Sequence, residues 1–193
     1  MMASANTLNQ QIRELSHWHQ LAFSIALCER MLPNYQLFSE AVAWGDAATL
    51  TNSLNAAWDA LRTKPSQFNH ERWQEKLAEN IPDPEDYDMY GVWPAMDAAT
   101  ALDTLFSLFA EPKGPAALEI SRLSRHCVKQ YIQITEGEDV ELKTHPLMQY
   151  EFDMQSELVE WLADHAKSPN TVSQLRKEFL SPLISNLGLS IEE

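Results

Sequence analysis

Apolar residues recur at spacings of three and four along most of the chain, which is the repeat of one face of an α-helix. The run over residues 95–110 shows this clearly, with Ala98, Leu102, Leu105 and Phe109 on one face. No stretch of five or more residues alternates apolar and polar side chains with the period of two that a β-strand requires. The pattern predicts an all-α fold, an irregular antiparallel bundle of about seven or eight helices.

Proline and glycine mark where these helices should begin and end. All of the ten prolines except Pro182 fall at the ends of helical segments. Thr7 and Gln10 form a capping-box pattern at the start of the first helix, which Pro33 should end, and Pro182 should bend the last helix. The expected helices cover residues 7–32, 34–42, 46–61, 69–81, 94–110, 115–135, 146–165 and 168–187.

The length of the chain bounds the number of domains. At 193 residues it fits a single all-helical domain over residues 1–193. A domain of this size buries roughly 70% of the surface that its unfolded chain exposes. Its hydrophobic content of 45% can therefore fill a core without disulfides or a structural metal.

Charge narrows the choice of partners. The chain has 28 acidic and 14 basic residues, a net charge of −14, so it should repel nucleic acid and anionic membrane surfaces. The N-terminus does not follow a basic segment with an apolar one, as a secretory signal does. The longest apolar run, Leu21–Cys28, is far shorter than the ~20 residues of a membrane span. We expect a soluble, cytoplasmic protein.

The sequence lacks the short motifs of well-known active sites. It contains no glycine-rich nucleotide loop, no GxSxG, no HExxH and no CxxC. Cys28 and Cys127 are the only cysteines, and we expect both to be buried thiols in a reducing compartment. We therefore expect no cofactor and assign no catalytic residue, and whether the protein is an enzyme stays open.

Residues 82–97 combine acidic and aromatic side chains in an irregular segment. Asp86, Asp88, Gly91 and Asp97 fall at positions 1, 3, 6 and 12 of a calcium-binding loop. The match fails at position 5, which is Tyr90, and at position 12, where the loop needs a bidentate Glu. A cation held by Asp86, Asp88 and Asp97 is thus a secondary alternative. The favoured interpretation packs the aromatic rings against the bundle and leaves the carboxylates in water.

Glu29 and Arg30 follow directly on a stretch that is apolar on two faces of the first helix. A charge at such a place needs a partner. We predict a buried or half-buried ion pair that joins neighbouring helices, with a ligand-binding arginine as the alternative.

Together these residues give a candidate binding surface. Long aromatic loops on a rigid scaffold often carry function, and aromatic anchors flanked by carboxylates suit a basic partner. We expect a protein-interaction or regulatory module with a protein partner or a homodimer, and an enzyme or binding protein with a carboxylate-coordinated divalent cation as the alternative. The candidate surface consists of Glu29, Arg30, Tyr87, Asp88, Tyr90 and Trp93.

Two further groups of polar residues are weaker candidates for a metal site. His17 and His19 are two positions apart on a helix and point in nearly opposite directions, so they should not share a metal ion, and His19 should be a hydrogen-bonded core residue. The seventh helix carries four acids along one face, but a di-metal bundle also needs Glu-x-x-His pairs, which the sequence lacks. We expect a solvated acidic face that consists of Asp153, Glu157, Glu160 and Asp164.

Five blocks of the sequence form a specific series: LCERMLPNY (27–35), WGD (44–46), DPEDYDMYGVWPAMDAATAL (83–102), EFDMQ (151–155) and SNLGL (185–189). These blocks resemble the YjaG-like family of uncharacterised bacterial proteins. The resemblance spans nearly the whole chain, with the blocks in the same order. It implies a mainly helical, cytoplasmic protein and brings no established activity, substrate, cofactor or catalytic residue.

Overall fold

The computed structural model describes residues 4–191, and across that range the secondary structure is entirely helical. The predicted all-α fold is therefore confirmed. Its helices are α1 (Ala5–Glu14), α2 (His17–Val42), α3 (Ala47–Arg62), α4 (His70–Ala78), α5 (Val92–Ala110), α6 (Ala116–Glu136), α7 (Pro146–Ala163) and α8 (Pro169–Phe179), with short 3-10 turns η1 (Pro65–Gln67) and η2 (Pro84–Asp86).

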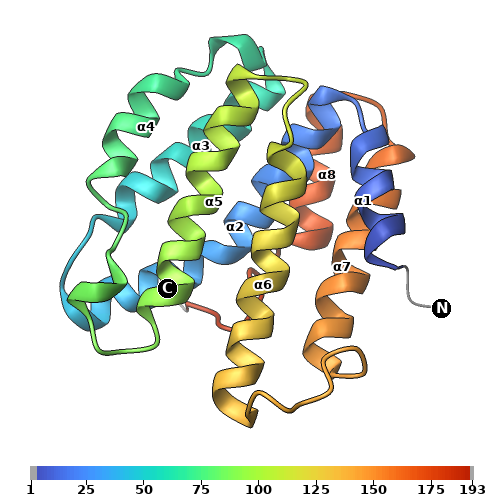
Figure 1. The fold of residues 1–193 in the computed structure, drawn as a ribbon. Helices are drawn as coiled ribbons and strands as arrows, with labels where there is room; N and C mark the ends of the chain where they lie inside the picture. Colours follow the sequence, from blue (N-terminus) through green and yellow to red (C-terminus); the bar gives the residue numbers. More distant parts are fainter. Residues whose placement is uncertain (1–3, 192–193) are drawn as a thin grey trace.

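Helix α2 is the centre of the fold. It passes behind α5 and α6 in Figure 1 and contacts α3, α7 and α8 as well. Nearly every residue from Trp18 to Tyr35 is buried, including positions on opposite faces such as Phe23 and Ile25. The two apolar stripes of the sequence are explained by this position, because a helix that is surrounded on several sides needs more than one apolar face.

The first predicted helix is two helices. Ser4, not Thr7, is the N-cap of α1, and its hydroxyl accepts from the Thr7 amide. Leu15 then takes an extended conformation, and the Ser16 hydroxyl accepts from the His19 amide to start α2. A serine cap satisfies amides that the first turn of a helix leaves free, so the chain can restart a helix in a new direction there.

Pro33 was expected to end a helix and instead lies inside α2. A proline there removes one helical hydrogen bond, at a cost of about 3 kcal/mol. Its neighbours Leu32 and Tyr35 are buried, as is Pro33 itself. Packing of these residues holds the helix together, and Asn34 is consequently a buried position within α2 and not a cap.

The last helix is shorter than predicted. It ends at Phe179, and residues 180–191 form an irregular tail, here called the C-terminal segment. This segment returns to the bundle, where Leu187 and Leu189 lie near Pro94 in the first turn of α5. Its Ser185 amide donates to the Leu189 carbonyl (2.7 Å), and the Asn186 side chain is buried.

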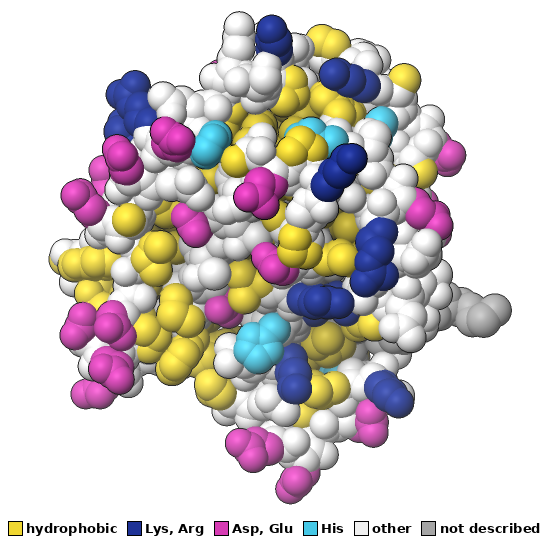
Figure 2. Space-filling view, turned by 45° about the horizontal axis from the view of Figure 1, so that its top comes forward, with side chains coloured by type: hydrophobic (Ala, Val, Ile, Leu, Met, Phe, Trp, Pro, Cys, Tyr) yellow, Lys and Arg dark blue, Asp and Glu magenta, His cyan; other side chains and the backbone are white. Residues whose placement is uncertain are grey.

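Charge is unevenly distributed over the surface. Figure 2 shows Lys and Arg side chains mainly on the right-hand part of one face, and acidic side chains mainly along its left and lower edges.

Among residues 4–191, no helix combines the length and the apolar character needed to cross a membrane.

Candidate functional site

The predicted ion pair involving Arg30 is present and buried. The Arg30 guanidinium donates from Nη1 to Oε1 of Glu151 (3.3 Å) and from Nη2 to Oε2 (3.0 Å), which joins α2 to α7. Ser124 and Gln155 also donate to Glu151 Oε1, at 2.6 and 2.9 Å. Arg30 therefore does not lie on a binding surface, contrary to the prediction, because its charge is fully used inside the core.

Glu29 forms a separate, half-buried contact with α3 and α8. Its Oε1 lies 3.5 Å from Arg176 Nη2 and accepts from the Trp58 indole at 3.4 Å. Burial raises the pKa of Glu29, while the Arg176 charge opposes that effect. Glu29 and Arg30 thus each form an ion pair with another helix, Glu29 with Arg176 of α8 and Arg30 with Glu151 of α7. An ion pair that joins neighbouring helices was predicted here.

The aromatic residues of the acidic and aromatic segment, residues 82–97, divide into two groups. Tyr87 packs edge-on against Phe38 (5.0 Å between ring centres) and lies against Trp44. Trp93 is 41% exposed, and Asp88 is exposed. The expected packing of aromatic rings against the bundle holds for Tyr87 but not for Trp93.

The acidic candidates for a cation site do not come together. Asp97 lies in α5, which begins at Val92, so residues 92–97 are helix and not loop. Asp97 is buried, whereas Asp86 and Asp88 are exposed. Within the described part of the chain, no group of three His, Cys, Asp or Glu side chains is placed to hold a metal ion.

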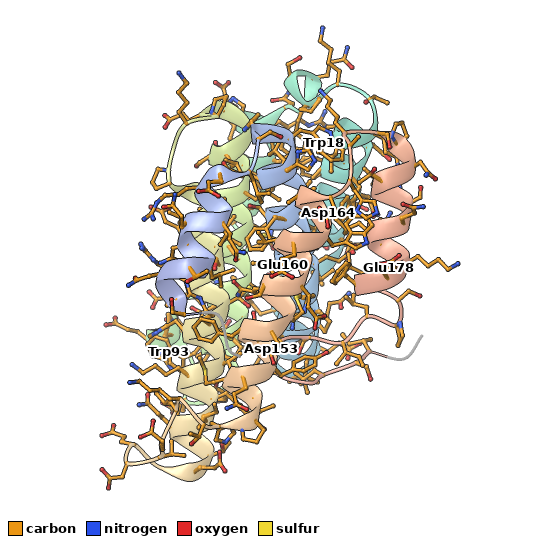
Figure 3. All side chains as sticks on the ribbon, turned by 90° about the vertical axis from the view of Figure 1, so that its right-hand side faces the viewer. Trp18, Trp93, Asp153, Glu160, Asp164 and Glu178 are labelled. Carbon is orange, nitrogen blue, oxygen red and sulfur yellow. The ribbon has the colours of Figure 1, made fainter. Side chains whose placement is uncertain are left out.

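The remaining polar candidates behave as expected, except that His19 is half-buried and not a core residue. The acids of α7 are exposed along its outer side, where Figure 3 shows Asp153, Glu160 and Asp164. The His19 Nε2 lies 2.7 Å from the His165 carbonyl, and its Nδ1 lies 2.5 Å from the Ser16 hydroxyl, so both ring nitrogens have partners.

A pocket of about 230 Å³, here called the Tyr90 pocket, lies where α2, α5, α6 and the C-terminal segment meet. Its walls are mainly aliphatic and aromatic. Leu37 and Met89 are 50% and 38% exposed, so the pocket has an apolar rim that solvent reaches. Its lining residues are Asn34, Leu37, Phe38, Ala41, Met89, Tyr90, Gly91, Pro94, Tyr131, Leu187 and Leu189.

Two polar side chains in the pocket wall have buried oxygen atoms without a hydrogen-bond partner. One is the side-chain carbonyl oxygen of Asn34, a residue only 3% exposed, and the other is the Tyr90 hydroxyl. The Asn34 amide nitrogen is occupied, since it donates to Asn186 Oδ1 at 2.8 Å. A buried polar atom without a partner costs about 1–3 kcal/mol, so these two oxygens distinguish the pocket from an ordinary packing defect.

Asp97 lies on α5 one turn beyond Pro94, and its buried Oδ2 is also without a partner. Burial raises the pKa of Asp97 to about 6, and the neighbouring Cys127 thiol opposes this. Burial also raises the pKa of Tyr90, with smaller contributions from Cys127, Asp97 and Tyr131. The thiol of Cys127 lies between Asp97 and Asn186, and both cysteines are buried as predicted.

Sequence reasoning placed Tyr90 among the candidates and Asp97 only in the alternative cation site, and it missed Asn34 and Asn186. One signal was available for Asp97. It stands three residues after Pro94 and four before Ala101, so it occupies the buried face of α5 and not a loop. Asn186 gave no such signal, because the helix predicted over residues 168–187 ends at Phe179 and the segment that holds Asn186 is irregular.

Relatives of this chain cover nearly its whole length. A protein from Salmonella typhimurium named "Uncharacterized protein YjaG" is 33% identical over 193 residues, covering 97% of this chain and 98% of the relative. An "Uncharacterized protein" from Haemophilus influenzae is also 33% identical over 194 residues, covering 97% of this chain and 99% of its own.

A solved structure shows the same fold. The crystal structure of a DUF416 family protein from Shewanella baltica OS155 superposes with a TM-score of 0.89 at 34% identity, covering 95% of this chain and 98% of that one. The family model described as "Protein of unknown function (DUF416)" matches residues 7–190. The resemblance to YjaG is thereby confirmed, and the chain belongs to the DUF416 family of proteins of unknown function.

Proposed function

We propose that this protein is a binding module and that the Tyr90 pocket is its site. The observation that carries the proposal is the Asn34 side-chain oxygen, which is buried in an otherwise apolar wall without a partner. Ligand sites are typically apolar concavities with a few convergent polar groups. The occupant is a compact molecule with an apolar body and one polar end that reaches Asn34 and Tyr90.

The test is direct binding of small aromatic probes with different polar ends. Amide signals in two-dimensional NMR spectra of the labelled protein should shift on addition of 2-phenylethanol or 2-phenylethylamine, with the largest changes at Leu37, Tyr131 and Leu189. Ala41→Trp should abolish these shifts by filling the pocket, because Ala41 lines it.

Ala78→Trp provides a matched control, because Ala78 is an exposed alanine on α4, away from the pocket lining. This variant should bind the probes as the parent does. Absence of shifts with every probe, or equal shifts in Ala41→Trp, would contradict the proposal.

The rim of the pocket favours a second candidate, an apolar side chain of a protein partner. Leu37 and Met89 are exposed at the mouth, and Asp86 and Asp88 lie just before Met89 in the chain. These features suit an apolar anchor with basic neighbours. A blocked peptide of arginine, phenylalanine and arginine should then shift the same signals and fail to do so in Ala41→Trp. No shift with this peptide, alongside binding of the small probes, would leave the small molecule as the occupant.

A further inference from the structure

The geometry points to a specific chemical class of ligand: an organic ammonium ion, a protonated primary amine on a compact apolar body. This inference rests on the proposed function, since it names the polar end of the molecule that occupies the Tyr90 pocket. Four independent features of the described residues support it.

The first feature is the orientation of the Asn34 amide. Asn186 Nδ2 donates to the Ser124 carbonyl (3.3 Å) and hydroxyl (3.1 Å), so Asn186 must present its Oδ1 to Asn34. Asn34 therefore has to donate its nitrogen to Asn186, at 2.8 Å. Its free atom is consequently the oxygen, which can only accept a hydrogen bond. The ligand must donate.

The second feature is a buried carboxyl group on α5, that of Asp97. Asp97 is 5% exposed, its Oδ2 has no hydrogen-bond partner, and none of the ion pairs among the described residues involves it. Asp97 lies one turn of α5 beyond Pro94, which lines the pocket. A buried carboxylate without a counter-charge is unfavourable, and an ammonium group would supply that charge.

The third feature is the aromatic lining. Phe38, Tyr90 and Tyr131 all line the pocket, and the centres of the two tyrosine rings are 6.3 Å apart. Aromatic faces attract organic cations, and the attraction is stronger where the site is shielded from water. The same rings also provide apolar contact for the body of the ligand.

The fourth feature is the absence of competing positive charge. No Lys or Arg is among the residues that line the pocket, and the chain as a whole carries a net charge of −14. The field of the protein therefore attracts cations and repels anions at this site. A carboxylate ligand would face the unpartnered Asn34 oxygen and no charged donor, only the hydroxyls of Tyr90 and Tyr131. An alcohol would offer a single donor and no charge.

The experiment compares three probes with similar bodies and different end groups at pH 7.5. These are 2-phenylethylamine, 2-phenylethanol and 3-phenylpropionate, titrated into the full-length protein by NMR. We expect the amine to bind at least tenfold more tightly than the alcohol, which corresponds to about 1.4 kcal/mol. The carboxylate should bind more weakly than the alcohol.

The decisive variant is Asp97→Asn, which keeps the shape of the side chain and removes its charge. The amine should lose its tenfold advantage in this variant, while the affinity for the alcohol stays within about threefold of the parent value. Asp103→Asn on the same helix is the matched control and should preserve the preference for the amine, because Asp103 is partly exposed and lies nine residues beyond the lining residue Pro94, whereas Asp97 is buried one turn from it.

The possible failures are distinct. If the alcohol binds as tightly as the amine in the parent protein, or if Asp97→Asn retains the preference, the amine inference is wrong and the binding module stands. If none of the three probes binds, the proposed function fails together with the inference.

Discussion

The guanidinium of Arg30 and the carboxylate of Glu151 form a two-pronged ion pair in the interior, between residues 121 positions apart in the sequence. Both side chains are almost fully buried. Ser124 and Gln155 satisfy the same carboxylate, and Ser124 also accepts from Asn186 of the C-terminal segment. One buried polar network therefore fixes α2, α6, α7 and the C-terminal segment relative to one another.

Breaking this pair should destabilise the protein strongly. Glu151→Ala leaves the Arg30 charge buried without a partner, so the free energy of unfolding in urea should fall by about 3–5 kcal/mol. Asp153→Ala, two residues further along α7 and exposed, should change it by less than about 0.5 kcal/mol. Replacing both partners, as Arg30→Met with Glu151→Leu, should cost much less than Glu151→Ala alone. A loss below about 1 kcal/mol in Glu151→Ala would show that the network contributes little.

Replacement of Gly45 should lower the free energy of unfolding for two reasons, and a control variant can separate them. Its φ of +81° is unfavourable for any residue with a Cβ, and a Cβ there would collide with the Tyr35 hydroxyl, which donates to the Asn80 carbonyl at 2.8 Å. Gly188 has the same φ but open space around it. Gly188→Ala should therefore lower the free energy of unfolding by about 1–2 kcal/mol, and Gly45→Ala by a further 1–3 kcal/mol or so.

The double variant Gly45→Ala with Tyr35→Phe tests this explanation. Removal of the hydroxyl relieves the collision, so the combined loss should be smaller than the sum of the two single losses in thermal or urea unfolding. Equal losses for Gly45→Ala and Gly188→Ala would show that the collision is absent.

Asp97 should make stability depend on pH in the opposite direction to an ordinary salt-bridged carboxylate. Burial raises its pKa from 3.8 to about 6 in the folded protein, so the folded state holds this proton more tightly than the unfolded state. The resulting stabilisation is fully present below pH 3.8 and is lost as pH rises through 6. A pKa difference of about 2 corresponds to a loss of about 3 kcal/mol, at about 1.4 kcal/mol per pKa unit.

The comparison with Asp97→Asn isolates this contribution. Urea unfolding at pH 3.5 and pH 7.5 should show the variant close to the parent at the lower pH and more stable by about 1–3 kcal/mol at the higher pH. The neighbouring Tyr90 hydroxyl and Cys127 thiol have raised pKa values and stay neutral throughout this range. A variant that is less stable than the parent at pH 7.5 would contradict the prediction.

Both thiols should be unreactive in the folded protein. Cys28 and Cys127 are 3% and 1% exposed, and burial raises the pKa of each thiol. Because the thiolate is the reactive species, Ellman's reagent at pH 8 should react with neither thiol on the time scale on which it labels free cysteine. In 8 M urea both should react rapidly. Fast labelling of the native protein at either position would show that the core opens there.

Local features of the sequence were enough to predict most helices. Asp46, Asn69 and Ser168 each begin a helix where predicted, because a side-chain oxygen placed before an apolar period is a local signal. The errors occurred where tertiary contacts outweighed such signals. Pro33 is retained inside α2 because its surroundings bury it, and the helical period after Phe179 is lost as the C-terminal segment packs back on the bundle.

In the candidate site, too, local signals in the sequence were visible and the effects of tertiary contacts were not. The sequence drew attention to the segment around Tyr90 and to the charges at Glu29 and Arg30, since aromatic rings in a loop and charges in an apolar stretch are visible without a fold. It did not show that Arg30 belongs to the core and Tyr90 to a pocket. Burial of a single polar residue depends on which helices cover it.

What the sequence determined by itself was the class of fold, because helical period and caps involve residues only three or four positions apart. What only the tertiary structure decided was the meeting of Asn34, Pro94, Tyr131 and Leu189 around one pocket. These residues come from four separate parts of the chain. Their proximity results from the packing of α2, α5, α6 and the C-terminal segment, and no local pattern encodes contacts over such separations.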